Sequence, residues 1–264
     1  MMVKMAKPQA PVLDFEDCSG MDSFDIATYR KQNNMIYYIN VGRNVARNAS
    51  RTNYFIVSDI EMVPSEHLAP RFLAMIRKIM SSKKYDEGFI FSKTAFVVPL
   101  FEVERGEEIP RDKATLIRMV SSNRATYFHQ KVCPHCQRFP GLQTWLLTSN
   151  DNVSPMWVAH REYPYHRWEP LYFGTNKDPW YSEQLSWEGK QEKMTQMLEL
   201  CLLRYRMIIL DGAFLCHAAS PKHVNKYHGA QLKNVKMYMK IVGALKERYP
   251  KRAQCKINYM GIVD

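Results

Sequence analysis

The sequence has 264 residues, of which 46% are hydrophobic and 12% aromatic, which is enough apolar material for one sizeable core. Lys and Arg number 37 against 26 Asp and Glu, so the formal net charge is +11 and anionic ligands are expected. The basic residues are scattered and form no zinc-finger, helix-turn-helix or RNA-recognition pattern, which argues against a dedicated nucleic-acid-binding protein.

Membrane and targeting segments are not expected in this chain. The N-terminus lacks the continuous apolar core of a signal peptide. The longest apolar stretch, residues 207–219, is interrupted by Asp211 and is too short to span a bilayer. The sequence therefore predicts neither a targeting signal nor a membrane anchor in this chain.

Helices and strands are predicted to alternate in the first half of the chain. Residues 1–30 show little periodicity and are expected to be irregular. The elements predicted after them are a helix over 40–50, a strand over 54–58, an amphipathic helix over 66–80, one or two strands within 88–103, and a helix over 111–121.

The second half continues this pattern. Its predicted features are a loop over 126–140 that contains CPHC, the aromatic loop HREYPYHRWEPLYFG, a helix over 190–203, a strand over 205–210 that leads to FLCH, and a basic surface helix over 234–249. This alternation predicts an α/β fold with a mostly parallel mixed sheet flanked by helices, and ligands beyond the carboxyl ends of the strands. Residues 31–255 are expected to form one domain, followed by a tail over 256–264.

The stretch TNYFIVSDIE carries an apolar strand directly into two acids, Asp59 and Glu61. One interpretation is structural, with Asp59 as a turn former or helix N-cap and Glu61 as a solvated loop acid. The other is a divalent-metal site, because alternate residues at the end of an extended chain can place two oxygen ligands around one hard cation. Such a cation neutralises a diphosphate leaving group.

Several motifs in a fixed order point to one family. The run NVGRNVARNASRTNYFIVSDIEMVPSEHL resembles the donor-site region of glycosyltransferase family 49, and the motifs VPLFEV, CPHCQ, RWEPLYF and FLCH follow in the family's order. The likeness covers roughly residues 35–255, and CPHCQ is closest to the glucuronyltransferase branch.

The resemblance implies a GT-A fold, a UDP-sugar donor such as UDP-glucuronate, a Mn²⁺ ion, and inverting transfer to a glycoprotein glycan in the Golgi lumen. It also implies that Asp59, Glu61 and His217 are the metal ligands, and that Arg43, Arg47 and Asp59 lie beside the donor. Homo-oligomers or assemblies with related transferases are compatible with it. Charge pattern alone leaves a second interpretation of Arg43 and Arg47, as a solvated helix face.

The acceptor side departs from the family pattern. Where the family has Asp-Glu-Arg-Phe, this chain has Ser182-Glu183-Gln184-Leu185. Glu183 is therefore the expected general base that takes the proton of the acceptor hydroxyl. A second hypothesis is a catalytically degenerate relative that binds glycan or nucleotide sugar without turnover. This hypothesis rests on three departures from the family pattern. Glu61 replaces the second Asp of the family's Asp-x-Asp motif, Ser182 replaces an Asp, and residues 1–30 do not resemble the family's first strand-helix unit.

Two further groups of residues have open interpretations. A zinc site at Cys133 and Cys136 would need a second ligand pair of suitable spacing, and the sequence has none; the family's oxidising lumen implies a disulfide instead. The aromatic loop from Tyr163 to Phe173 is either core and rim or part of an acceptor platform, in which Trp168, Trp180 and Trp187 stack on sugar faces.

Overall fold

The structure, a computed structural model, describes residues 29–82, 92–148, 150, 152–219, 228–250 and 255. The chain divides into two compact units, Met1–Ile36 and Tyr37–Asp264. The described part of the first unit contains the short helix α1 (Tyr29–Gln32), and the rest of the segment expected to be irregular lies outside the described residues. All other described elements belong to the second unit.

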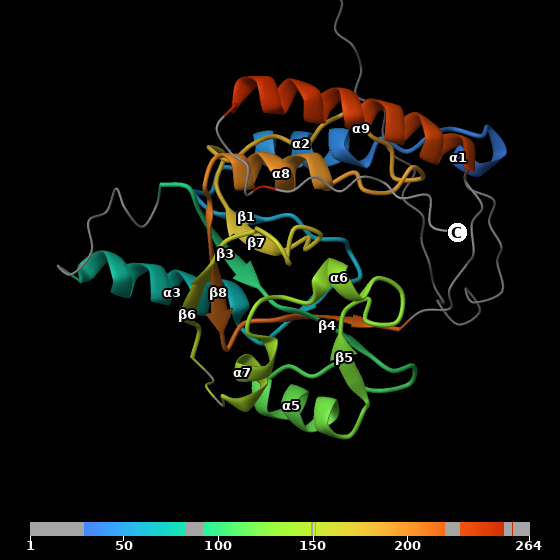
Figure 1. Ribbon diagram of the computed structural model, residues 1–264. Coiled ribbons are helices and arrows are strands. Elements are labelled where there is room, and N and C mark those ends of the chain that lie inside the picture. The colour runs from blue at the N-terminus through green and yellow to red at the C-terminus, as the bar shows by residue number, and fades with distance from the viewer. Residues whose placement is uncertain are drawn as a thin grey trace, which may run out of the picture. The chain divides into compact units, whose positions relative to one another are not determined.

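The second unit contains two sheets (Figure 1). The five-stranded sheet has the order β1 (Phe55–Ile56), β7 (Leu171–Gly174), β3 (Thr94–Val98), β8 (Arg206–Asp211) and β6 (Ser154–Ala159). The four-stranded sheet has the order β2 (Val63–Pro64), β9 (Leu215–Ala218), β4 (Leu100–Val103) and β5 (Ala125–Tyr127). The predicted α/β class with mixed sheets is confirmed.

Strand direction differs from the prediction. Of the seven described strand pairings, only β3 with β8 and β4 with β9 run parallel. The expectation of mostly parallel strands is therefore wrong. Strand β7, which lies between β1 and β3, runs antiparallel to both, and the pairings of β2 with β9, β4 with β5 and β6 with β8 are antiparallel as well. Local periodicity reports which face of a strand is buried, but it says nothing about the direction of a distant partner.

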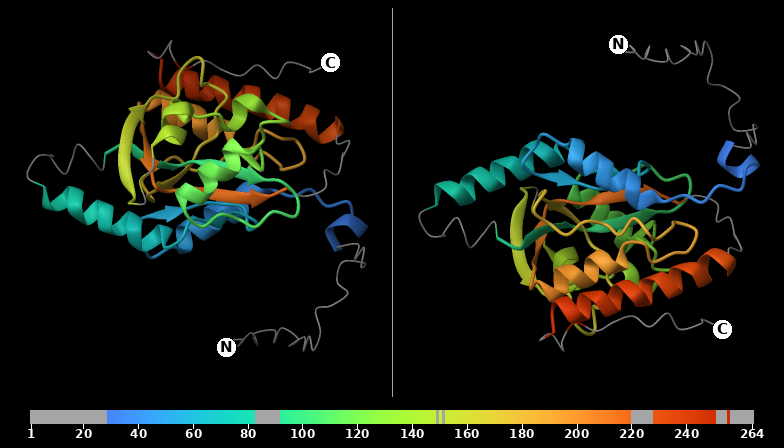
Figure 2. Two further views of the ribbon diagram at one scale, coloured as in Figure 1. Left: turned by 90° about the horizontal axis from the view of Figure 1, so that it is seen from below. Right: turned by 90° about the horizontal axis from the view of Figure 1, so that it is seen from above.

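Helices cover both faces of the five-stranded sheet. The helices of the second unit are α2 (Ile39–Ala49), α3 (Leu68–Ser81), α5 (Lys113–Ser121), α6 (Pro134–Gln137), α7 (Leu142–Leu147), α8 (Met194–Leu202) and α9 (His228–Arg248). Figure 2 shows α2 and α3 on one side of the strands and α8 and α9 on the other. Phe96 of β3 packs with α3, whereas its neighbour Val97 packs with α5, α7 and α8. This alternation follows from the period of two along a strand.

Two segments differ from their predictions. Helix α9 was expected to be a surface helix, but Tyr238, Val242 and Leu245 are buried against α8 at helical spacing. The expected loop over 126–140 contains the end of β5 and the short helix α6. For α9 the helix itself was predicted, and only its burial, which depends on the distant helix α8, was missed.

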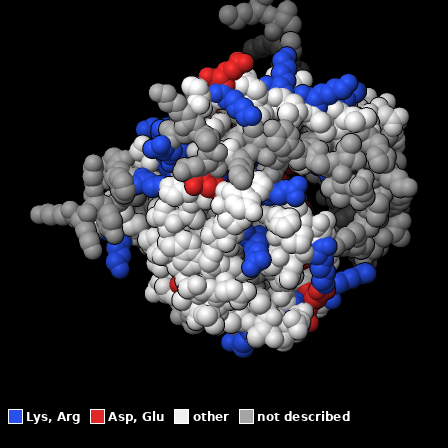
Figure 3. All heavy atoms as spheres, viewed as in Figure 1, with Lys and Arg blue, Asp and Glu red and all other residues white. Residues whose placement is uncertain are grey.

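The surface charge is dispersed. On the face that Figure 3 shows, Lys and Arg side chains are spread over the described surface and do not gather into one patch. Among the described helices, none is both long and apolar enough to cross a membrane.

Candidate functional site

Helix α2 buries a polar face. Its buried residues recur at helical spacing, and all are at most 7% exposed: Asn40, Arg43, Asn44 and Arg47. Buried polar groups need hydrogen-bond partners, and this face finds them on residues 178–192. For example, Asn40 Nδ2 donates to the carbonyl oxygens of Ser182 and Glu192 at 2.8 Å each. These bonds fix α2 to the 178–192 segment.

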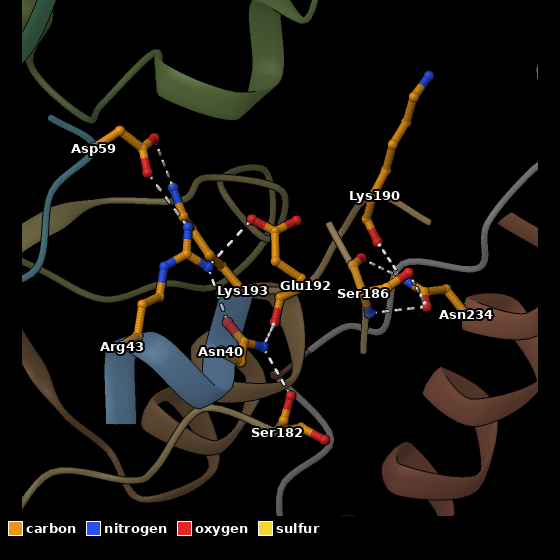
Figure 4. Close-up of polar contacts among 9 residues, drawn as sticks. All are labelled: Asn40, Arg43, Asp59, Ser182, Ser186, Lys190, Glu192, Lys193 and Asn234. Carbon is orange, nitrogen blue, oxygen red and sulfur yellow. Dashed lines mark hydrogen bonds and ion pairs between the residues drawn. The ribbon is translucent and has the colours of Figure 1, made fainter. Parts of the chain in front are cut away.

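A charged network lies at the end of β1 (Figure 4). Arg43 Nη2 lies 3.5 Å from Asp59 Oδ1, and Lys193 Nζ lies 3.8 Å from Asp59 Oδ2. Arg43 Nη1 also donates to Asn40 Oδ1 at 2.9 Å and to Glu192 Oε1 at 3.3 Å. Asp59 is 37% exposed, so this acid remains accessible while two cations hold it.

A cavity of about 550 Å³ opens beside this network. Its walls come from α2, from β1 with the loop after it, and from two aromatic residues outside these elements. The lining residues are Tyr37, Ile39, Gly42, Arg43, Ala46, Arg47, Phe55, Ile56, Val57, Ser58, Asp59, Ile60, Glu61 and Trp187. The volume lies within the range of small-molecule sites. Four of the predicted site residues thus share one cavity.

The third expected metal ligand, His217, is not among the residues that line the cavity. Val63 pairs with Cys216, so the loop that carries Glu61 leads into the strand next to His217. Nevertheless, the described residues include no group of three or more His, Cys, Asp and Glu side chains that could hold a metal ion. His217 Nδ1 instead lies 3.8 Å from Glu102 Oε2. The structure does not gather the three expected ligands, and Mn²⁺ binding stays a prediction.

Glu183, the expected general base, is anchored beside α2. Asn44 Nδ2 donates to Glu183 Oε1 at 2.9 Å and to the carbonyl oxygen of Tyr181 at 2.8 Å. Glu183 is exposed and is not among the residues that line the cavity. Its position is therefore defined, and its catalytic role stays a prediction.

Arg47 holds the turn that follows β7. Its Nη1 and Nη2 donate to the carbonyl oxygens of Pro179 and Asp178 at 2.7 and 2.9 Å, and its Cζ lies 4.7 Å from the ring centre of Trp180. Arg47 Nε is buried without a hydrogen-bond partner in the described structure. Since Arg43 is 7% and Arg47 1% exposed, the interpretation of these two residues as a solvated helix face is wrong.

The tryptophans separate into core and surface. Trp168 is 1% exposed and packs in the core, so it cannot stack on an acceptor sugar. Trp180 and Trp187 are 48% and 43% exposed. The acceptor-platform hypothesis is therefore corrected for Trp168, and it stays a prediction for the other two.

Cys133 and Cys136 form a disulfide, which agrees with the family resemblance and removes both from metal binding. The loop that they close is bonded to the RWEP segment, since Glu169 N donates to the Cys136 carbonyl oxygen at 2.8 Å. Burial raises the pKa of the Glu169 carboxyl above its usual range, and the positive charge of Lys193 opposes this shift. A second disulfide joins Cys201 of α8 to Cys255.

The comparison with known protein families decides which family this is. A family model described as "Glycosyl-transferase for dystroglycan", which is glycosyltransferase family 49, matches residues 4–250. The chain belongs to this family. The family resemblance of the sequence motifs is thereby confirmed.

Relatives within glycosyltransferase family 49 show what the chain is similar to. Beta-1,4-glucuronyltransferase 1 of Danio rerio is 27% identical over 226 residues, which is 84% of this chain and 50% of that protein. The Homo sapiens protein of the same name is 28% identical over 84% of this chain and 51% of its own length. Xylosyl- and glucuronyltransferase LARGE1 of Danio rerio is 25% identical over 81% of this chain and 26% of its own length. The chain spans about half the length of the glucuronyltransferases it matches.

Some residues of the candidate site carried no signal in the sequence. The polar spacing of α2 by itself predicts a solvated face, so the burial of that face could not be read from the pattern. Lys193 and Tyr37 could not be found from a local pattern either. Tyr37 is bonded to Glu188, which lies 151 residues away, and no local pattern encodes such a contact.

Proposed function

We propose that this chain forms the donor-binding part of a glycosyltransferase that moves glucuronate from UDP-glucuronate to a glycoprotein glycan. The observation that carries the proposal is the cavity at the end of β1, which brings Arg43, Arg47 and Asp59 together. Membership of glycosyltransferase family 49 and the names of the relatives support the same reaction class.

The residues of the cavity suit an anionic donor. A nucleoside diphosphate carries negative oxygens, and guanidinium groups match such oxygens by paired hydrogen bonds. Arg43, whose guanidinium also contacts Asp59 and Glu192, lines the cavity and is the group proposed to bind the diphosphate. Arg47 lines the same cavity and adds positive charge, while its Nη1 and Nη2 stay bonded to the carbonyl oxygens of Pro179 and Asp178. Lys193 adds a third positive charge beside Asp59. These cations stabilise the charge that develops on the departing diphosphate.

In the proposed inverting reaction, the acceptor hydroxyl oxygen bonds to the anomeric carbon as the bond from that carbon to the UDP oxygen breaks. The proton of the hydroxyl passes to a carboxylate, for which we propose Glu183. The two disulfides agree with an oxidising compartment, and we propose the Golgi lumen.

The first experiment is a thermal or urea melt with UDP. At a hundredfold excess over its Kd, a ligand that binds only the folded state stabilises it by about 2.7 kcal/mol. We expect this stabilisation with UDP and Mn²⁺ together and a much smaller one with UDP alone, since the metal is a predicted requirement. Adenosine diphosphate serves as the control nucleotide. No shift with any combination contradicts the proposal.

A second experiment tests Glu183. We expect Glu183→Gln to keep the hydrogen bond from Asn44 and the affinity for UDP, and to lower sugar transfer by about 10²-fold. Ser182→Asp, which restores the family residue, should then change little. The assignment fails if Ser182→Asp raises transfer strongly while Glu183→Gln leaves it unchanged.

A family member that binds without turnover is the second candidate. It is favoured by two observations within the described residues: the expected metal ligands form no group of three, and Glu183 does not line the cavity. Binding of UDP without transfer to any glycan would support this candidate and not the first.

A further inference from the structure

Two aromatic side chains line the same cavity as Arg43 and Asp59 and are held there by hydrogen bonds between distant segments of the chain. Tyr37 and Trp187 are 46% and 43% exposed, so part of each ring is accessible to a ligand in the cavity. They come from segments 150 residues apart in the sequence, by the difference of their numbers. Their common place at one cavity needs an explanation beyond core packing.

Hydrogen bonds in both directions join the segment of Tyr37 to the segment of Trp187. Trp187 N donates to the Tyr37 carbonyl oxygen at 2.9 Å. In return, Tyr37 N lies 3.1 Å from each carboxylate oxygen of Glu188, which is only 6% exposed. Hydrogen bonds to a buried carboxylate are among the stronger ones. The pair is therefore fixed before any ligand arrives.

The loop that carries Trp187 is itself rigidly built (Figure 4). Asn234 of α9, 3% exposed, donates from Nδ2 to the carbonyl oxygens of Ser186 and Lys190 at 2.9 and 3.0 Å, and accepts from Ser186 N at 3.1 Å. A Cβ at Gly189 would come within 2.1 Å of Asn234 Cγ, so only glycine permits this approach. A loop with this many internal bonds presents Trp187 at a low cost in conformational entropy on binding.

We propose that Tyr37 and Trp187 form a stacking site for the planar base of the nucleotide donor, a further step that rests on the proposed function and replaces the acceptor-platform hypothesis for Trp187. Flat aromatic rings bind nucleobases through their faces. The guanidinium of Arg43, which lines the same cavity, receives the diphosphate, so one cavity offers both a cation and aromatic faces to a nucleoside diphosphate. The site is formed by residues 37 and 187 together, and a change at either one weakens it.

Binding of UDP and of inorganic pyrophosphate to the full chain tests this proposal, because pyrophosphate shares the charge of UDP and lacks the base. Trp187→Ala is expected to weaken UDP binding by about 10- to 100-fold and to leave pyrophosphate binding within about twofold. Trp187→Phe, which keeps an aromatic face, should recover most of the affinity. Calorimetry with and without Mn²⁺ measures each Kd.

The neighbouring tyrosine supplies a matched control. Tyr38 is as exposed as Tyr37, at 46%, and is not among the residues that line the cavity. Tyr37→Ala should therefore lower UDP affinity, and Tyr38→Ala should not. The comparison of Tyr37→Ala with Tyr38→Ala also tests the stacking site if Trp187→Ala does not fold. Equal losses for UDP and pyrophosphate, or unchanged UDP affinity, overturn the stacking site alone. A wild-type chain that binds neither ligand overturns the proposed function and the stacking site together.

Discussion

Lys113→Met is expected to lower the free energy of unfolding by about 3–5 kcal/mol, because it leaves a buried carboxylate without its partner. Lys113 is 2% exposed, and its Nζ bonds to Asp211 Oδ1 and, at 2.8 Å, to Thr148 Oγ1. The ammonium also lies 4.0 Å from the ring centre of Trp145, which is fully buried. Urea unfolding, followed by tryptophan fluorescence, measures the change.

A surface ion pair of the same residue types gives the control. Lys131 Nζ lies 2.6 Å from Glu104 Oε1, but these side chains are 61% and 46% exposed, so Lys131→Met should hardly move the unfolding midpoint. The double variant Lys113→Met with Asp211→Asn should recover part of the loss, since the buried charge is gone and an oxygen remains for Gly212 N. A single Lys113→Met variant as stable as the wild type would show that the pair is hydrated in solution.

Most of the elements of the fold could be predicted, because their signals are local. The helix predicted over 40–50 is α2 (Ile39–Ala49), and the strand predicted over 205–210 is β8 (Arg206–Asp211). Apolar spacing near 3.6 or 2 residues decides such elements. The direction of β7 and the buried face of α9 were not predictable in this way. Both depend on a partner far along the chain, as the contact of Tyr238 with α8 shows.

The candidate site could be predicted only in part, because some of its residues are also placed by contacts with distant parts of the chain. Arg43 and Asp59 were identified from family motifs, and the structure pairs them at 3.5 Å. Lys193 and Trp187 reach the same region from the 178–193 segment, whose course is set by hydrogen bonds to α2 and Asn234. Those bonds join positions more than 40 residues apart, and the sequence around either partner looks like an ordinary polar turn.

The acid at the end of β1 is expected to be the most sensitive position for catalysis. We expect Asp59→Asn to lower sugar transfer by about 10³-fold, the size of loss seen when one preorganised electrostatic group is removed. Asparagine keeps the shape of the side chain, but it lacks the charge that holds Arg43 and Lys193 in place at the cavity. Because Asp59 is 37% exposed and its ion pairs face solvent, the melting temperature should change little.

A neighbouring acid distinguishes a specific effect of Asp59 from a general effect of charge. Glu66 is 61% exposed and is not among the residues that line the cavity, so Glu66→Gln changes the net charge equally without touching the site. It should transfer sugar at the wild-type rate. Initial rates with UDP-glucuronate and an acceptor glycan, together with the Kd of UDP, separate binding from turnover. If Asp59→Asn retains transfer within about threefold of the wild type, the carboxylate at the end of β1 takes no part in the reaction, and the catalytic charge must come from another part of the cavity.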